Sequence, residues 1–205
     1  MSGFWDKRQS PAAEPAALSL KIPYNDPAVV QRLSHHLGRF LEPLEHHRRI
    51  VVVCVGTDRS TGDSLGPLVG TSLLREANSN FELYGTLDEP VHAMNLSETL
   101  QKIMRASRDP YIIAVDACLG QVSSVGCIQL GAGPVRPGAG VNKELPPVGD
   151  IHMTGIVNVG GFMEYFVLQN TRLNLVMKMA DMISLSLQKA IRQARGDFIP
   201  YALPD

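Results

Sequence analysis

The sequence predicts an α/β protein, a three-layer α/β/α sandwich with a mostly parallel central sheet. Apolar runs rich in β-branched residues alternate along the chain with segments whose apolar residues recur at helical spacing. This alternation is typical of a sheet that carries helices on both faces. The clearest unit spans residues 50–75, where an apolar run stops at Gly56, a polar loop follows, and a helical pattern begins. In open sheets of this class, ligands collect at that strand-to-helix edge.

Size and composition indicate one folded domain preceded by an arm. The chain has 205 residues, of which 44% are hydrophobic and 19% are charged, enough for a domain with a real core. Residues 1–25 hold prolines, alanines and scattered charges without a period, so we expect a disordered N-terminal arm there. Residues 26–205 are expected to form a single α/β domain.

Charge, hydropathy and cysteine content indicate the cellular compartment of the protein and the classes of partner that it does not bind. The net charge is −1 and no basic block stands out, so a nucleic-acid partner has no electrostatic support. No apolar run approaches the roughly 18 residues of a bilayer span, and the N-terminus lacks the apolar core of a secretory signal. Cys54, Cys118 and Cys127 form no CxxC pair and are expected to be reduced, buried thiols. These features predict a cytoplasmic protein without a membrane partner.

The N-terminal half is predicted to alternate between helices and strands. Asp26 and Pro27 are typical of a helix start. Asn95 and Glu98 have the spacing of a capping box, with an amide in place of the usual hydroxyl. The elements expected here are a helix over 27–42, a strand over 50–56, a helix over about 64–77, a strand over 81–87, and a helix that follows Asn95 and ends before Pro110.

The C-terminal half contains a long loop and an ambiguous tail. Residues 131–150 are rich in glycine and proline, and loops of this length are usually functional or mobile. The tail from Thr171 fits both strand alternation and helical spacing, and we choose a short strand followed by a helix. The elements expected here are strands over 111–116 and 125–130, a helix over 154–168, a strand over 172–177 and a helix over about 180–194.

The loop after the first predicted strand does not match a phosphate-binding loop. Five residues separate Gly56 from Gly62, where the P-loop pattern has four, and Asp63 stands where that motif needs a lysine. A carboxylate beside a phosphate adds repulsion. The dinucleotide pattern G-x-G-x-x-G is also absent after this strand. We therefore favour an interpretation without a nucleotide.

Two aspartates are the candidate catalytic residues. Asp63 lies near the start of the helix after the first strand, and Asp116 closes the strand predicted over 111–116. If the two strands are neighbours in a parallel sheet, their spacing of about 4.8 Å brings both carboxyls to one edge. Two carboxyls in a small site do not both ionise easily, so one is expected to hold a proton. Such a pair can act as general base and general acid on a bound water and a leaving amine.

Each acid also has other interpretations. Asp63 is well placed as a helix N-cap, and Asp116 can cap the loop after its strand. Asp58 is a competing acid, in a part of the loop where we expect it to be solvated. The leading interpretation needs no cofactor. A divalent metal held by the two aspartates, with His152 as a third member of the site, is the alternative.

Several long motifs resemble one family of sporulation proteins. In chain order they are Val-Cys-Val-Gly56 with Gly62-Asp63-Ser-Leu-Gly66-Pro67, then Ile-Ala-Val-Asp116-Ala, then Lys143-Glu-Leu-Pro-Pro-Val-Gly-Asp150 and Thr154-Gly-Ile-Val-Asn158. These motifs closely resemble the YyaC sporulation proteins, also called spore protease YyaC, from about residue 48 to the end of the last helix. That family is similar to the germination protease of spore formers and, more distantly, to hydrogenase maturation endopeptidases. The resemblance implies a sandwich of the phosphorylase/hydrolase-like kind.

The resemblance also implies roles for individual residues. In the germination protease, one aspartate stands in a loop that ends Asp-x-Leu-Gly-Pro and another closes an Ile-Ala-Val-Asp-Ala strand. Asp63 and Asp116 match these two positions, which implies aspartate-dependent proteolysis. The maturation endopeptidases bind nickel through two acids and a histidine, and Asp63, Asp116 and His152 follow that order along the chain. Gly62, Gly66 and His152 are expected to contact the substrate, the glycines by allowing close backbone approach.

The expected function is therefore peptide-bond hydrolysis on a protein or peptide substrate, in the forespore or spore core. The chain is much shorter than the germination protease and has no obvious counterpart of that enzyme's self-processed propeptide. The alternative is a non-catalytic sporulation protein of the same fold that binds a peptide or partner. Exposed apolar residues on the first or last helix would support a homodimer.

Overall fold

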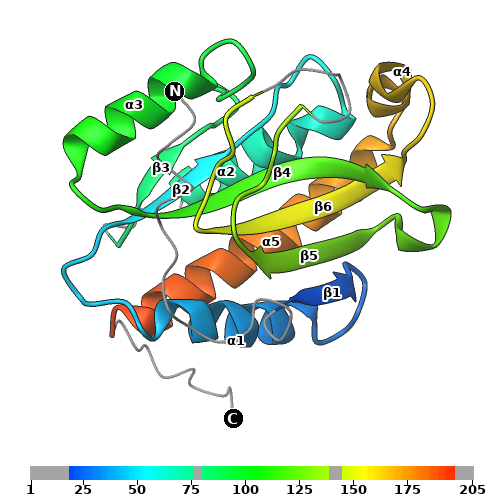
Figure 1. Cartoon of the computed structure of the whole chain (residues 1–205). Helices are drawn as coiled ribbons and strands as arrows, with labels where there is room; N and C mark the ends of the chain where they lie inside the picture. Colours follow the sequence, from blue (N-terminus) through cyan, green and yellow to red (C-terminus); the bar gives the residue numbers. More distant parts are fainter. Residues whose placement is uncertain (1–18, 76–79, 139–144, 197–205) are drawn as a thin grey trace.

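The computed structural model describes residues 19–75, 80–138 and 145–196. This part of the chain contains one mixed central sheet (Figure 1). Its strands are β1 (Leu20–Pro23), β2 (Ile50–Cys54), β3 (Glu82–Tyr84), β4 (Tyr111–Gly120), β5 (Cys127–Ala132) and β6 (Ile151–Val159). Their order across the sheet is β1-β5-β6-β4-β2-β3. Strands β3, β2, β4 and β6 run parallel, whereas β5 is antiparallel to both of its neighbours. The predicted mostly parallel sheet is confirmed.

Helices cover both faces of the sheet and give the predicted three layers (Figure 1). They are α1 (Val29–Leu41), α2 (Leu65–Arg75), α3 (Leu96–Ala106), α4 (Glu164–Gln169) and α5 (Leu173–Ala194), with 3-10 turns η3 (Gly62–Ser64) and η4 (Val122–Ser124). Helices α1, α2 and α5 share the larger apolar cluster on one face, and α3 packs on the other. None of the helices in the described ranges combines the length and apolar character needed to cross a membrane.

Strand β2 shows how the two faces are filled. All five of its residues are buried. Successive side chains point to opposite faces, so Val52 and Cys54 join the cluster of α1, α2 and α5, while Val51 and Val53 join that of α3. A strand buried on both faces needs a continuous apolar run, which is why the sequence predicted it clearly.

Residues 154–168, predicted as one helix, instead divide between a strand and a short helix. Strand β6 lies between β4 and β5 and continues to Val159 before α4 begins at Glu164. Ile156 and Val157 are 4% and 1% exposed, because a central strand buries both of its faces. By their spacing alone, these adjacent apolar residues fit a helix as well as a strand. Pairing with the two neighbouring strands makes this segment a strand.

The strand predicted over 172–177 is also wrong, because α5 is a single helix of 22 residues. Its buried residues, such as Val176, Ala180, Ile183 and Leu187, recur every three or four positions. Of the apolar residues that suggested alternation, Leu173 and Met177 are exposed, whereas Leu175 packs against the core and Met179 is buried. The helix predicted over 180–194 is confirmed as part of α5.

The N-terminal arm predicted over residues 1–25 is wrong for its last part. Strand β1 pairs with β5, with Ile22 opposite Ile128, and Ile22 is 1% exposed. Alternate side chains of β1, Leu20 and Ile22, face the cluster of α1 and α5, and this burial orders the segment. The domain therefore begins before residue 26. Residues 1–18, and residues 197–205 at the other end, lie outside the described residues.

The segment predicted as a loop over 131–150 is partly paired. Strand β5 takes its first two residues. Val135 and Val148 then form an antiparallel bridge, with N–H groups donated in both directions at 2.8 and 2.9 Å. Val135 and Leu145 also pack against the apolar cluster of α3. This contact holds the segment beside the carboxyl end of β2, while residues 139–144 lie outside the described residues.

Candidate active site

The loop between β2 and α2 folds back over the carboxyl end of its strand. The Thr57 N–H donates to the Asp63 carbonyl at 3.0 Å, and the Asp63 N–H donates to the Ser60 carbonyl at 3.1 Å. Gly56 lies beneath this turn at φ 147°, and a Cβ there would lie 2.1 Å from the Asp63 carbonyl oxygen. Only glycine permits this approach. The local sequence therefore fixes Asp63 close to the end of β2.

Asp116 reaches the same edge from β4. Cys54, the last residue of β2, pairs with Val115, so Asp116 is the first β4 residue beyond the end of β2. On its other side Asp116 pairs with Thr154 of β6. It is 6% exposed, and its Oδ1 accepts the N–H of Ala117 at 2.8 Å. The prediction that Asp116 ends its strand is wrong, because β4 continues, but its side chain still lies beyond the end of its neighbour.

Asp63 and Asp116 line one cavity of about 690 Å³. The end of β2 and its loop form one part of the wall, and the middle of β4 forms another. The rest of the cavity wall is formed by residues 92–94, by residues 135–138 with Leu145, and by α4. The structure therefore brings the two acids together at the strand-to-helix edge of the sheet.

Burial makes the ionisation of both acids less favourable than in water. It raises the pKa of the Asp63 carboxyl. Burial raises the pKa of Asp116 well above its usual range, and the negative charge of Asp63 raises it further. The N–H of Ala117 opposes this rise because it stabilises the carboxylate. Asp116 is therefore the acid of the pair that keeps its proton to higher pH.

Neither Gly62 nor Gly66 is among the described residues that line the cavity. A Cβ on Gly66 would lie 2.1 Å from the Val55 carbonyl oxygen, and one on Gly62 would lie 2.8 Å from Cδ2 of Leu168. The two glycines allow close approach, as predicted, but to other parts of the protein. They pack α2 onto β2 and the Asp63 loop onto α4.

His152 is likewise outside the cavity wall in the described part of the chain. Its Nδ1 lies 2.9 Å from the Gly133 carbonyl oxygen, and its ring lies against Gly131 of the neighbouring strand. Asp58 is exposed and also does not line the cavity. Within the described residues, no group of three His, Cys, Asp or Glu side chains has the arrangement to hold a metal ion. Of the three residues in the metal interpretation, Asp63 and Asp116 line the cavity and His152 does not.

His92 lines the cavity although the sequence did not single it out. The carbonyl of Val91 accepts the Gly56 N–H at 2.8 Å, which ties this segment to the end of β2. Asn95 makes no side-chain cap for α3, contrary to the capping-box prediction. Its Oδ1 accepts the His92 N–H at 2.8 Å, and its Nδ2 donates to the Pro90 carbonyl at 3.0 Å. The amide thus shapes the turn that presents His92.

Cys118 is a further group in the cavity wall. Burial raises the pKa of its thiol, and a hydrogen bond with the Thr154 side chain partly opposes this. The thiol therefore stays protonated near neutral pH and is not poised as a nucleophile. Arg59 and Arg136 also line the cavity and place positive charge at its wall.

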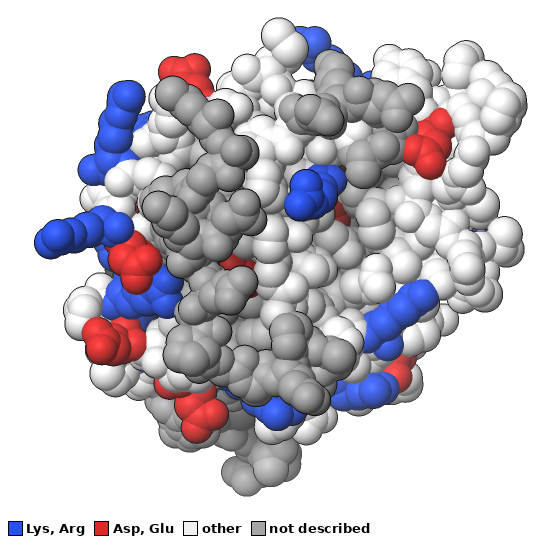
Figure 2. Space-filling view, in the orientation of Figure 1, with Lys and Arg blue, Asp and Glu red and all other residues white. Residues whose placement is uncertain are grey.

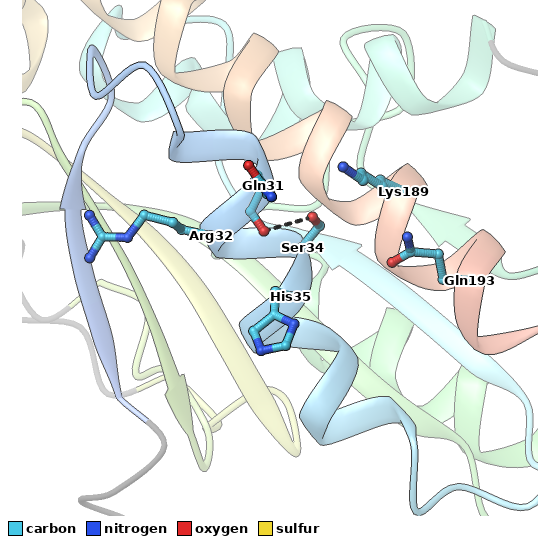
Figure 3. Close-up of a pocket in the computed structure, with 6 residues that line it drawn as sticks. All are labelled: Gln31, Arg32, Ser34, His35, Lys189 and Gln193. Carbon is cyan, nitrogen blue, oxygen red and sulfur yellow. Dashed lines mark hydrogen bonds between the residues drawn. The ribbon is translucent and has the colours of Figure 1, made fainter. Parts of the chain in front are cut away.

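A second cavity, of about 490 Å³, lies between α1 and α5 (Figure 3). Ser34 donates to the Gln31 carbonyl at 3.1 Å within α1, and Arg32 is paired with Asp26 at 3.0 Å. No carboxylate is among its described lining residues, which are Gln31, Arg32, Ser34, His35, Lys189 and Gln193. It offers no acid–base pair comparable with that of the first cavity.

The fold and the first cavity define an α/β protein with one buried and one half-buried carboxyl, Asp116 and Asp63, at the carboxyl edge of its parallel strands. The chain belongs to the family described as "Protein of unknown function (DUF1256)", whose model matches residues 21–186. It is 62% identical over 138 residues to "Uncharacterized protein YyaC" of Bacillus subtilis (strain 168), a match that covers 67% of each chain. The predicted membership of the YyaC family is confirmed.

A solved structure with a similar fold is a NiFe hydrogenase maturation protease, HycI from Thermococcus kodakarensis KOD1. The similarity covers 71% of this chain and 92% of that chain, with a TM-score of 0.48 and 18% sequence identity.

Proposed function

We propose that this protein is a peptidase of the spore-forming cell that hydrolyses peptide bonds with Asp63 and Asp116. The observation that carries the proposal is the shared cavity, in which the charge of one acid raises the pKa of the other. Two carboxyls that titrate apart supply a base and an acid at the same pH. The forespore or spore core is the proposed place of action, on the basis of the YyaC resemblance.

The two acids have different proposed roles because their surroundings differ. Asp63 is the more accessible and, as carboxylate, takes a proton from water while the water oxygen attacks the peptide carbonyl carbon. Asp116 holds its proton and gives it to the leaving nitrogen as the C–N bond breaks. Transfer of a proton from Asp63 to Asp116 then restores the starting state. No other group is required for the proton balance.

The hydrogen bonds of the two side chains favour this proposal over a purely structural role. Within the described residues, the Asp63 carboxylate accepts no hydrogen bond, and Asp116 accepts one, from Ala117. A helix cap or loop ligand would have its oxygens occupied by backbone N–H groups. Oxygens that remain available can bind water and a substrate amide.

Cleavage of small acid-soluble spore proteins tests the proposal. Wild type, Asp63→Asn and Asp116→Asn are compared, with Asp58→Asn as a matched control because Asp58 is exposed in the same loop but outside the cavity. We expect cleavage by wild type and Asp58→Asn, and a loss of about 100-fold or more in the other two, since each removes one proton-transfer group. Circular dichroism verifies the fold of each variant. Equal cleavage by all four proteins would refute the proposal and favour a binding protein of the same fold.

A further inference from the structure

An exposed apolar surface lies beside the cavity, on the two residues before α4, on α4 itself and on the first turns of α5. We call it the α4 surface. Its members are 49–81% exposed, although all are large apolar side chains: Phe162, Met163, Tyr165, Phe166, Leu173 and Met177. In Figure 2 the region over α4, at the upper right, is almost entirely white, which marks the scarcity of charge there. Contiguous exposed apolar side chains of this kind mark binding surfaces in soluble proteins.

The backbone before α4 adopts a conformation that is costly for its residue. Met163 has a φ of 47° and is the one residue other than glycine with positive φ in the described ranges. Gly161 precedes it at φ 120°, and its N–H donates to Oε1 of Glu164 at 3.0 Å. Helix α4 has no fully buried residue, so burial of its own side chains offsets little of this strain. Strained backbone that persists without such burial is concentrated at functional sites.

Helix α4 is fixed to the loop that carries Asp63. The Val167 carbonyl accepts bonds from Oγ1 of Thr171 at 2.9 Å and from Nδ2 of Asn158 at 3.3 Å. Leu168 packs against Gly62, next to Asp63. Glu164, Tyr165 and Leu168 line the cavity itself. The α4 surface is therefore continuous with the cavity wall.

We propose that the α4 surface binds apolar side chains of an unfolded polypeptide substrate, next to the peptide bond that lies in the cavity. The inference rests on the proposed peptidase function and adds the substrate class. Charge favours an apolar occupant, since residues 159–177 contain only Glu164, which bonds Gly161, and Arg172. A folded substrate would hide the apolar side chains that this surface accepts, whereas an unfolded chain presents them together with an accessible backbone.

Two labelled peptides test the inference by fluorescence anisotropy. One is a 20-residue disordered peptide that contains Phe and Leu, and the other has serine at those positions. Binding is measured on the Asp116→Asn protein, in which cleavage is suppressed, with and without Phe166→Ser. Leu185→Ser is the matched control, because Leu185 is 46% exposed on α5 outside the α4 surface. Phe166 is 56% exposed, so its replacement leaves the core intact.

We expect Phe166→Ser to weaken binding of the apolar peptide about tenfold, since one buried aromatic contact is lost. Leu185→Ser should leave the affinity unchanged, and the serine peptide should bind weakly to every variant. Equal affinity of Phe166→Ser and Leu185→Ser, or equal binding of both peptides, overturns the inference. A second explanation is that the α4 surface binds a second copy of this chain, and sedimentation equilibrium tests it. If the wild type is a dimer, and Phe166→Ser dissociates it without any change in peptide affinity, the surface is a dimer interface and the inference is overturned.

Cleavage kinetics distinguish the failure of this inference from the failure of the proposed function. In otherwise wild-type protein, Phe166→Ser should raise KM about tenfold for the apolar peptide with kcat unchanged. If no peptide is cleaved although the binding differences appear, the peptidase proposal fails and the binding surface stands. If cleavage occurs with the same KM in wild type, Phe166→Ser and Leu185→Ser, the surface has no role and the peptidase proposal stands.

Discussion

Replacement of Asp116 by asparagine is expected to change how the free energy of unfolding depends on pH. In the folded protein, burial and the charge of Asp63 raise the pKa of Asp116 well above its usual range. In the unfolded chain the pKa returns to about 3.9. Between these two values the folded state holds a proton that the unfolded state has released. Asp116 therefore contributes stability that is fully present below the unfolded pKa and is lost as the pH rises through the folded pKa.

The size of this effect follows from the single proton. Within the window, the wild-type free energy of unfolding should fall by about 1.4 kcal/mol per pH unit at 25 °C because of Asp116. Asp116→Asn lacks the titrating group but keeps an Oδ1 that can accept the Ala117 N–H. Within the window, the free energy of unfolding of Asp116→Asn minus that of wild type should therefore increase by this amount per pH unit. This difference should become constant above the folded pKa. The charge of Asp63 raises the pKa of Asp116 in the folded protein. In an Asp63→Asn background this folded pKa should therefore be lower, and the pH range over which stability falls should end at a lower pH.

Urea denaturation followed by circular dichroism, repeated from about pH 4 to about pH 9, measures this difference. Asp58→Asn controls for the loss of one carboxylate, because Asp58 is exposed in the same loop. Parallel pH curves for wild type and Asp116→Asn would contradict the electrostatic description of the site. A wild type that gains stability relative to Asp116→Asn as the pH rises would contradict it as well.

Four further substitutions test the packing of the site and the core. Gly66→Ala should lower the free energy of unfolding, measured in urea, by about 1–3 kcal/mol or more, because its Cβ would lie 2.1 Å from a carbonyl oxygen. Gly38→Ala in α1 is the contrasting case: its Cβ would meet nothing within 4 Å, so the free energy of unfolding should rise by about 0.5–1 kcal/mol. Leu187→Ala should cost about 2–5 kcal/mol in the same assay, since the side chain is 0% exposed. Asn95→Ala should cost about 1–3 kcal/mol, measured by thermal denaturation, because the N–H of His92 loses its acceptor.

Local patterns predicted the part of the fold that depends on nearby residues. The strand from Ile50, the helix from Leu65 and the polar loop between them follow each other within one stretch of sequence, and the structure has all three. Asp63 could be found for the same reason. Asp116 could be placed near it because it lies where the parallel neighbour β2 ends, although β4 itself continues.

The misassigned elements depend on contacts between distant residues. Strand β1 is ordered by its pairing with β5, which lies more than 100 positions further along the chain. The residues of β1 have no local periodicity that would predict a strand. Ile156 and Val157 fit either a helix or a central strand until their neighbours are known. His92 enters the cavity because Val91 is bonded to Gly56, a contact that the spacing in the sequence does not reveal.

The packing of α1 against α5 joins the two ends of the described chain. Leu33 and Leu37 are fully buried, and Arg195 donates to carbonyl groups just after α1, at His46 and Arg48. During synthesis α1 leaves the ribosome long before α5, since chains emerge from the N-terminus. We therefore expect the part of the apolar stripe of α1 that packs on α5 to remain uncovered until α5 has been translated. Nascent chains of this protein should depend on chaperones throughout that interval, and ribosome-stalled chains that end before α5 should be protease-sensitive along α1.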